Sequence, residues 1–319
     1  MKRIALAFAF MLAVCAQAFA DPYPSKPVKV IVPYPPGGAV DVATRMVAQK
    51  LSEQLGQPFV VENKPGASSV IGSQLAAKAA PDGYTLVAND MTYSLLPHVF
   101  RTLPFDHEKD LVPVSTTMFA PYAIAVKADS PYKTLQDLIK AAKASPGKLT
   151  FGSGGPGSAP HFATESLSMA ANIELTHIPY KGAGEAMTGL IGGQVDVLMA
   201  SVPSLMAQAK GGRARILAVS GDKRLPALPD VPTFAEAGLK DWGILNFNGL
   251  WAPKGTPPDV IAKLQAEIAK ADATPEVRKF FESQGGLPGG TKSDEFGKLV
   301  QSTTKAWGPV AAKAKIEKQ

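Results

Sequence analysis

The stretch VKVIVPYPPGGAVDV, residues 28–42, decides the fold because it passes from a strand to a helix through a glycine-rich turn. Residues 28–32 are β-branched except for Lys29, which is typical of a buried strand. Prolines and glycines end this run at 33–38. From Asp41 the apolar residues recur with helical spacing until Gly56 supplies a stop. A strand, a loop and a helix in this order predict an α/β fold.

The same unit occurs a second time at about 149–172. The strand 149–151 meets a second glycine-rich loop, 152–158, and a helix follows from about 160 to 171. Other short apolar runs predict strands at 58–62, 84–88, 122–126, 175–178, 195–200 and 216–220. Amphipathic spacing predicts helices at 70–79, 134–144, 259–271, 275–283 and 293–307. A new unit is expected to begin near Ala120.

The N-terminus has the three parts of a secretory signal: Lys2 and Arg3, an apolar run over 4–14, and small residues at Ala18 and Ala20. We expect export to the periplasm and cleavage after Ala20. A membrane anchor is the alternative, but the apolar run is short for a membrane span. Lipoprotein processing at Cys15 is a second alternative, disfavoured by a bulky residue at position 14.

Cleavage would remove the only cysteine and leave a chain that exceeds the usual size of one hydrophobic core. Without Lys2 and Arg3 the basic residues fall from 33 to 31 against 27 acidic residues, a net charge of about +4. This mild excess, with no basic run, argues against nucleic acid and slightly favours anionic ligands. No histidine lies in a metal-binding spacing, so we expect no metal and no cofactor.

The two glycine-rich loops are candidate anion sites. The first amides of a helix lack internal partners and lie at the positive end of its dipole, so they can hold a carboxylate without Arg or Lys. Gly37, Gly38 and Ala39 offer such amides in the first loop. Ser153, Ser158 and Ala159 offer them in the second. Ordinary βα turns remain the alternative for either loop alone.

Two features of these loops do not by themselves indicate ligand binding. Asp41 would repel an anion but suits the helix dipole and can return a hydrogen bond to the loop. The spacing Gly152-x-Gly154-x-x-Gly157 fits a dinucleotide fingerprint, yet Pro156 lies inside it, which argues against that function.

A catalytic site is not evident. No serine lies in a G-x-S-x-G elbow and the carboxylates are scattered. His161 near Ser153 and Ser158 could act as a base, but we expect it to donate a hydrogen bond at the rim of the site. An exported hydrolase of esters or amides stays as an alternative from another class.

Several blocks of the chain resemble the Bug-type substrate-binding proteins of tripartite tricarboxylate transporters. The resemblance is carried by segments distributed in order along the mature chain: 23–27 (YPSKP), 33–41 (PYPPGGAVD), 61–66 (VENKPG), 80–86 (APDGYTL), 151–158 (FGSGGPGS), 177–182 (HIPYKG), 192–196 (GGQVD) and 228–238 (LPDVPTFAEAG).

The resemblance implies a two-domain "Venus flytrap" in which helices flank a mixed sheet in each domain and the ligand lies in the cleft between them. Domain 1 would take residues 21–122 and 228–319, and domain 2 residues 123–227. The partners would be a small organic anion, a di- or tricarboxylate, and the membrane subunits of the transporter, with the binding protein a monomer. A sensor subunit that presents its ligand to a signalling receptor is a further alternative.

The same resemblance implies which residues bind the ligand. They would come from the two loops and from the segments that follow neighbouring strands: Tyr34, Gly37, Gly38, Ala39, Asp41, Asp90, Thr92, Ser153, Ser158, Ala159, His161, Ala183, Ser201 and Phe247. The segments 89–92 and 199–201 depart from the family pattern, so we expect ligand choice to be set there. Tyr34, Trp242 and Phe247 could favour an aromatic acid, although Trp242 and Phe247 could equally be core residues.

Overall fold

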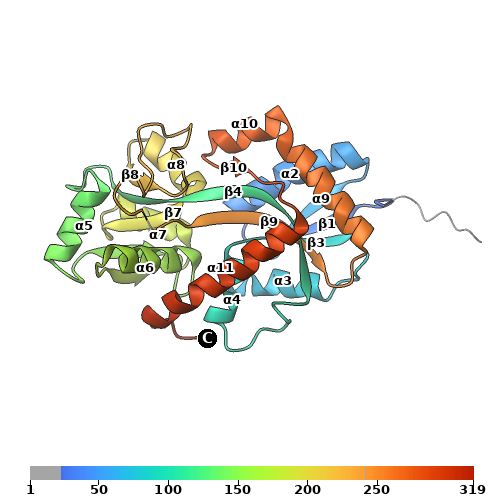
Figure 1. The fold of residues 1–319 in the computed structure, drawn as a ribbon, viewed down its shortest axis with the longest axis horizontal. Helices are drawn as coiled ribbons and strands as arrows, with labels where there is room; N and C mark the ends of the chain where they lie inside the picture. Colours follow the sequence, from blue (N-terminus) through green and yellow to red (C-terminus); the bar gives the residue numbers. More distant parts are fainter. Residues whose placement is uncertain (1–22, 241) are drawn as a thin grey trace, which may run out of the picture.

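Strand β4 (Leu111–Lys127) organises the fold because it is long enough to belong to two groups of strands. In the computed structural model, which describes residues 23–240 and 242–319, positions 111–121 of β4 pair with β9 (Leu245–Pro253). Positions 122–127 pair with β7 (Val197–Ser201) and β8 (Ala214–Val219). β4 therefore carries one sheet from a first lobe, on the β9 side, into a second lobe, on the β7 side (Figure 1).

The first lobe contains the strand with which the sequence analysis began. Its strands lie in the order β2 (Phe59–Asn63), β1 (Val28–Val32), β3 (Thr85–Asp90), β9 and the first part of β4, with β10 (Leu287–Pro288) on the far side of β4. β1 is parallel to β2 and β3, whereas β9 is antiparallel to β3 and β4. Burial on both faces explains the nearly continuous apolar sequence of β1.

The second lobe repeats the parallel arrangement. β5 (Thr150–Ser153) lies between β6 (Thr176–Pro179) and β7 and is parallel to both. β7 and β8 flank the second part of β4, and both are antiparallel to it. The mixed α/β fold with two lobes is the predicted fold class.

Helices follow most of the parallel strands. The first lobe carries α2 (Ala39–Leu55), the 3-10 turn η1 (Ala67–Ser69), α3 (Val70–Ala77), α4 (Thr92–Val99), α9 (Pro258–Ala273) and α10 (Pro275–Ser283). The second lobe carries α5 (Leu135–Ala144), α6 (Ala159–Ala171), α7 (Ala183–Ile191) and α8 (Val202–Lys210). Gly56 ends α2 with a φ of 69°, the left-handed conformation expected of a glycine stop.

The last helix, α11 (Ser293–Lys313), packs against both lobes. Near its start Phe296 lies 4.7 Å, ring to ring, from Trp251 of β9. Near its end Trp307 meets Phe162 of α6 edge to face at 5.6 Å. All four side chains are buried, and burying each large apolar group stabilises the fold by roughly 1.5–3 kcal/mol. α11 is thus a third connection between the lobes, beside β4 and β9 (Figure 1).

The structure differs from the sequence prediction in the extent of one strand and in several elements that were not predicted. The strand expected at 122–126 begins at Leu111, so the second unit starts near Ala120, as expected, but inside one long strand rather than at the beginning of a new one. Pro113 interrupts the apolar pattern, and the register shifts there and again near Thr116, as bulges that absorb the irregular residues. Helices α4, α7 and α8 and strand β9 were not predicted.

The segment between β8 and β9 lies against the second lobe. Thr233 bridges to Val219 of β8, and Trp242 Nε1 donates to Ser166 Oγ of α6 at 3.1 Å. We therefore place the return to the first lobe near Leu245, where β9 begins, in contrast to the expected boundary at residue 228.

The expected leader, its cleavage after Ala20 and Cys15 lie outside the described residues. Across residues 23–240 and 242–319, no helix is both long and apolar enough to span a membrane.

Candidate functional site

Parallel strands of both lobes end at the middle of β4. In the first lobe, Asp90 at the end of β3 pairs with Asn248 of β9, which pairs with Met118 of β4. In the second lobe, Ser201 at the end of β7 pairs with Tyr122 of β4. β3 has the same direction as β4, whereas β7 has the opposite direction. The carboxyl end of β3 and the carboxyl end of β7 therefore point toward each other. The two ends are separated by the four residue steps of β4 from Met118 to Tyr122, which span about 13 Å. Open α/β sheets bind ligands at such strand ends.

The first glycine loop connects β1 to α2 at this edge. Gly37 has a φ of 85°, which an L side chain rarely adopts, and its amide donates to Asp41 Oδ2 at 2.9 Å. Gly38 is the N-cap of α2, with a φ of −74° that any residue can adopt. The first helical amides, from Ala39 onward, begin directly at this loop.

Asp41 closes the first loop. Burial alone would raise the pKa of its carboxyl, but hydrogen bonds from Arg45, the Gly37 amide and Asn63 outweigh that effect and lower the pKa. Arg45 Nε donates to Oδ1 at 3.0 Å, and Asn63 Nδ2 donates to the same oxygen at 2.8 Å. The carboxylate is 3% exposed and fully engaged, so its contacts are those of a structural residue.

A second cluster lies at the end of β3, where Tyr34 from the first loop reaches Asp90. The Tyr34 hydroxyl is 2.7 Å from Asn89 Oδ1 and 2.8 Å from Asp90 Oδ1. The amide of Thr92 also donates to Asp90 Oδ1, at 2.9 Å. Burial raises the pKa of Asp90, and the hydrogen bonds from Thr92 and Tyr34 oppose only part of this rise. Tyr34, Asp90 and Thr92, which the sequence analysis named separately, thus form one cluster.

Asn89 is a site residue that the sequence analysis did not single out. Its Oδ1 accepts from Tyr34, and its Nδ2 donates to Ser69 Oγ at 3.2 Å and to Ser73 Oγ at 3.1 Å. Asn89 is fully buried. The sequence could have indicated its role, because a polar residue inside an apolar strand needs hydrogen-bond partners when it is buried.

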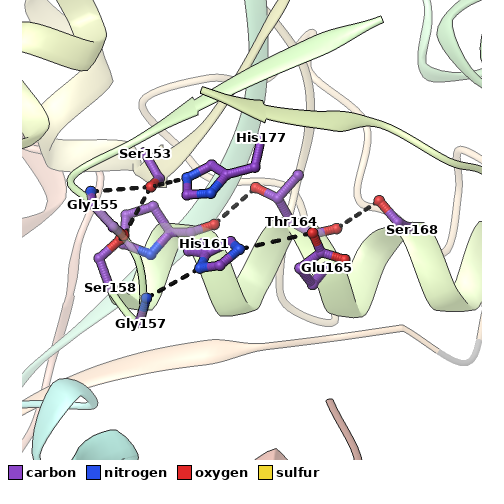
Figure 2. Close-up of polar contacts among 10 residues, drawn as sticks. Ser153, Gly155, Gly157, Ser158, His161, Thr164, Glu165, Ser168 and His177 are labelled. Carbon is purple, nitrogen blue, oxygen red and sulfur yellow. Dashed lines mark hydrogen bonds and ion pairs between the residues drawn. The ribbon is translucent and has the colours of Figure 1, made fainter. Parts of the chain in front are cut away.

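The second glycine loop connects β5 to α6 (Figure 2). Ser153 Oγ lies 2.6 Å from His177 Nε2 and accepts from the Gly155 amide at 3.1 Å. Ser158 Oγ donates to the Gly155 carbonyl at 2.8 Å. These bonds hold the loop in shape ahead of Ala159, the first residue of α6.

Beneath this loop two histidine rings stack, with centroids 3.9 Å apart. His161 Nδ1 accepts from the Gly157 amide at 3.1 Å, and Nε2 lies 3.8 Å from Glu165 Oε1 (Figure 2). Burial, with a smaller contribution from the charge of His177, lowers the pKa of His161 to about 4. His161 is therefore a neutral, buried support of the loop whose Nδ1 accepts from a backbone amide, so its ring proton lies on Nε2, which stays the nitrogen that can donate.

The remaining candidates have different surroundings. A Cβ on Gly154 would lie 3.4 Å from the Ala183 amide, so the start of α7 adjoins the second loop. Ser201 is the N-cap of α8, and its hydroxyl lies 2.9 Å from Ser204 Oγ. Phe247 is fully buried and packs edge to face on Phe296, so it is a core residue in this structure, as is Trp242.

At some of the helix starts along this edge, an acidic side chain of the protein accepts from the backbone amides; at others no acidic side chain is present. Asp41 accepts at the start of α2, Asp90 at the start of α4, and Glu185 from the Lys181 amide at the start of α7. α6 and α8 have no acidic residue in their first turns. Of these five helix starts, those of α6 and α8 thus offer first-turn amides with no adjacent acidic residue, whereas Asp41 lies beside the Ala39 amide in the first turn of α2.

The contacts of the serines bear on nucleophilic catalysis. Ser153 has a histidine partner, but its side chain is fully buried. The Ser158 hydroxyl donates to a carbonyl, and the nearby His161 Nδ1 already accepts from a backbone amide. Neither arrangement presents an accessible hydroxyl with a free base. Among the described residues there is no group of three or more potential metal ligands.

Comparisons with known proteins agree with this architecture. Residues 43–316 match the family described as the tripartite tricarboxylate transporter family receptor. A UPF0065 protein in the tcbD-tcbE intergenic region of Pseudomonas sp. (strain P51) is 40% identical over 90% of this chain and 86% of its own. The structure of the periplasmic binding protein BugD has a TM-score of 0.81 at 31% identity, covering 93% of this chain and all of that one (100%). R. palustris Rpa4515, solved with adipate, has a TM-score of 0.85 at 30% identity, with coverage of 93% and 100%.

Proposed function

The chain belongs to the tripartite tricarboxylate transporter receptor family, and from this premise we propose that it captures a small carboxylate in the periplasm and delivers it to the membrane subunits of such a transporter. The observation that carries the proposal is the convergence of helix starts from two lobes on the middle of β4.

The proposed grip uses backbone rather than charged side chains. The ligand carboxylate accepts hydrogen bonds from the first amides of α6, and the hydroxyls of Ser201 and Ser204 assist at the start of α8. The amides of Gly38 and Ala39 hold it from the first lobe. Hydrogen bonds to a charged group contribute about 1.5–3 kcal/mol each, so a few of them supply a useful affinity without Arg or Lys.

The proposed mechanism is closure of the two lobes on the ligand. β4 crosses between the lobes, the chain returns beside it at the start of β9, and α11 packs on both lobes. Bending of these three connections would bring the α2 and α6 helix starts together around the carboxylate, as in hinge closure of binding proteins. The closed form would then be the one that the membrane subunits recognise.

The ligand class follows from the site and from one relative. The structure of R. palustris Rpa4515 contains adipate, a dicarboxylate, which favours acids of similar size here. The buried positions of Phe247 and Trp242 give no support to an aromatic ligand.

Two rival functions make different predictions. An exported hydrolase would turn over a chromogenic ester and lose that activity in Ser158→Ala, whereas we expect no turnover by either protein. A sensor subunit would bind the same ligand, so capture of the membrane partner by the liganded protein distinguishes it from a transport receptor.

A thermal-shift screen tests the proposal. The protein is incubated with C4–C8 mono-, di- and tricarboxylates, aromatic acids, amino acids and sugars. Because a ligand stabilises only the folded state, at least one carboxylate should raise Tm in a concentration-dependent way. Stabilisation by sugars alone would refute the carboxylate function.

A further inference from the structure

Asp90 places a carboxylate of the protein at the edge where the ligand is proposed to lie. It is the last residue of β3, it is half-buried, and it lies at the point where β3 faces the second lobe. Its charge also acts on Tyr122 of β4: burial, and then the charge of Asp90, raise the pKa of that phenol. Asp90 therefore faces the middle of β4.

Asp90 lacks a basic partner. Across residues 23–240 and 242–319 it takes part in no salt bridge, whereas Asp41 on the same edge is paired with Arg45 at 3.0 Å. Tyr34 and the Thr92 amide both donate to Oδ1, and a hydrogen bond from the Thr92 side chain also lowers the pKa of the carboxyl, so the described donors to Asp90 are all neutral groups. A half-buried carboxylate without a cation is costly unless a bound group supplies the missing charge.

The position also prevents a second carboxylate from binding at the start of α4. Asp90 Oδ1 already accepts from the Thr92 amide there, so the protein occupies its own anion site. A dianionic ligand would bring a like charge next to Asp90, which is unfavourable at short range in a partly buried site.

On the basis of the proposed carboxylate function, we infer that Asp90 selects a carboxylic acid that also carries a positively charged nitrogen, in preference to a dicarboxylate of the same length. The carboxylate of the ligand binds the helix-start amides, and its ammonium group donates to the Asp90 carboxylate. The ligand class is a zwitterionic amino acid or ω-amino acid.

The test uses matched acids and an isosteric variant. At four and six carbons, the diacid (succinate, adipate) is compared by calorimetry with the monoacids of equal length that carry an ammonium group on the α- or ω-carbon. Asp90→Asn keeps an acceptor for Tyr34 and Thr92 and removes only the charge, so the fold is preserved; its Tm and circular dichroism verify this. Asp82→Asn, an exposed site in the first lobe, is the control with the same change in charge.

We expect the wild type and Asp82→Asn to bind at least one amino acid about tenfold or more tighter than its matched diacid. In Asp90→Asn this ratio should fall by about tenfold or more. Tighter binding of the diacid at both lengths would overturn the inference, as would a ratio that Asp90→Asn leaves unchanged. In either case, binding of any acid of the two series still supports the proposed carboxylate function. If no acid of either series binds, the inference is overturned, and the wider thermal-shift screen decides separately whether the proposed function also fails.

Discussion

We expect the buried carboxyl of Asp272 to make the free energy of unfolding depend on pH in an unusual way. It lies in the last turn of α9, is 2% exposed, and neither carboxyl oxygen has a hydrogen-bond partner among the described residues. Burial raises its pKa to about 8, and a weak contact from the amide of Gly289 opposes only part of this. The charged form is therefore strongly disfavoured in the fold.

The magnitude follows from proton linkage. In the unfolded chain the pKa of the same carboxyl is 3.8, so between 3.8 and about 8 the folded state binds more protons than the unfolded state. The free energy of unfolding then falls as pH rises through this window, by about 1.4 kcal/mol for each unit. Relative to a neutral side chain, Asp272 costs about 1.6 kcal/mol at pH 5 and about 5 kcal/mol at pH 8.

Asp272→Asn removes this cost, so its stabilising effect should be about 3–4 kcal/mol larger at pH 8 than at pH 5. Urea unfolding at both pH values measures the difference, with circular dichroism and tryptophan fluorescence required to give coincident transitions. Asp230→Asn, at an exposed position, is the control and should show little dependence on pH. An equal effect of Asp272→Asn at pH 5 and pH 8 would refute the reasoning.

Two further predictions concern buried or capping side chains. The folded state holds His161 neutral, with a pKa lowered to about 4 against 6.5 in the unfolded chain, so its contribution to stability should be lost as pH falls from about 6.5 to about 4. His161→Ala should remove this dependence and cost about 1–3 kcal/mol at pH 7, because the Gly157 amide loses its acceptor; urea unfolding at pH 7 and pH 4.5 measures both effects. Thr134 accepts from the Asp137 amide at 3.1 Å in the capping box of α5, so Thr134→Ala should lower the free energy of unfolding by about 1 kcal/mol. Thr134→Ser should retain most of that energy, and equal losses in the two variants would contradict the capping role.

Much of the fold could be predicted because its signals are local. The run at 28–32, the glycine loop and the helical spacing up to Gly56 lie within one continuous segment, and the structure has β1 and α2 there. Helix α4 escaped prediction because its sequence, TYSLLPHV, is short and contains Pro97. The first part of β4 escaped because Pro113 breaks its pattern, while its partner β9 lies more than a hundred residues away.

The contacts of the candidate site likewise include some that are local in the sequence and some that depend on the pairing of distant strands. The role of Asp41 as a loop-closing residue could be predicted because Gly37 is only four positions away. The stack of His161 on His177 could not, since β6 and α6 are brought together only by the pairing of β5 with β6. The link between Tyr34 and Asp90 likewise depends on β1 lying beside β3.

The central claim, that backbone amides at helix starts hold the ligand carboxylate, is tested most directly at Gly38. A Cβ there would meet only the Pro35 carbonyl oxygen, at 3.8 Å, so Gly38→Leu should fold normally while its side chain covers the start of α2. Gly297→Leu is the control, because a Cβ at this α11 position meets nothing within 4 Å and lies away from the two glycine loops. Calorimetry with the acid that raises Tm most should show a loss of about 100-fold or more for Gly38→Leu and little change for Gly297→Leu. An affinity of Gly38→Leu within about threefold of the wild type would contradict the account.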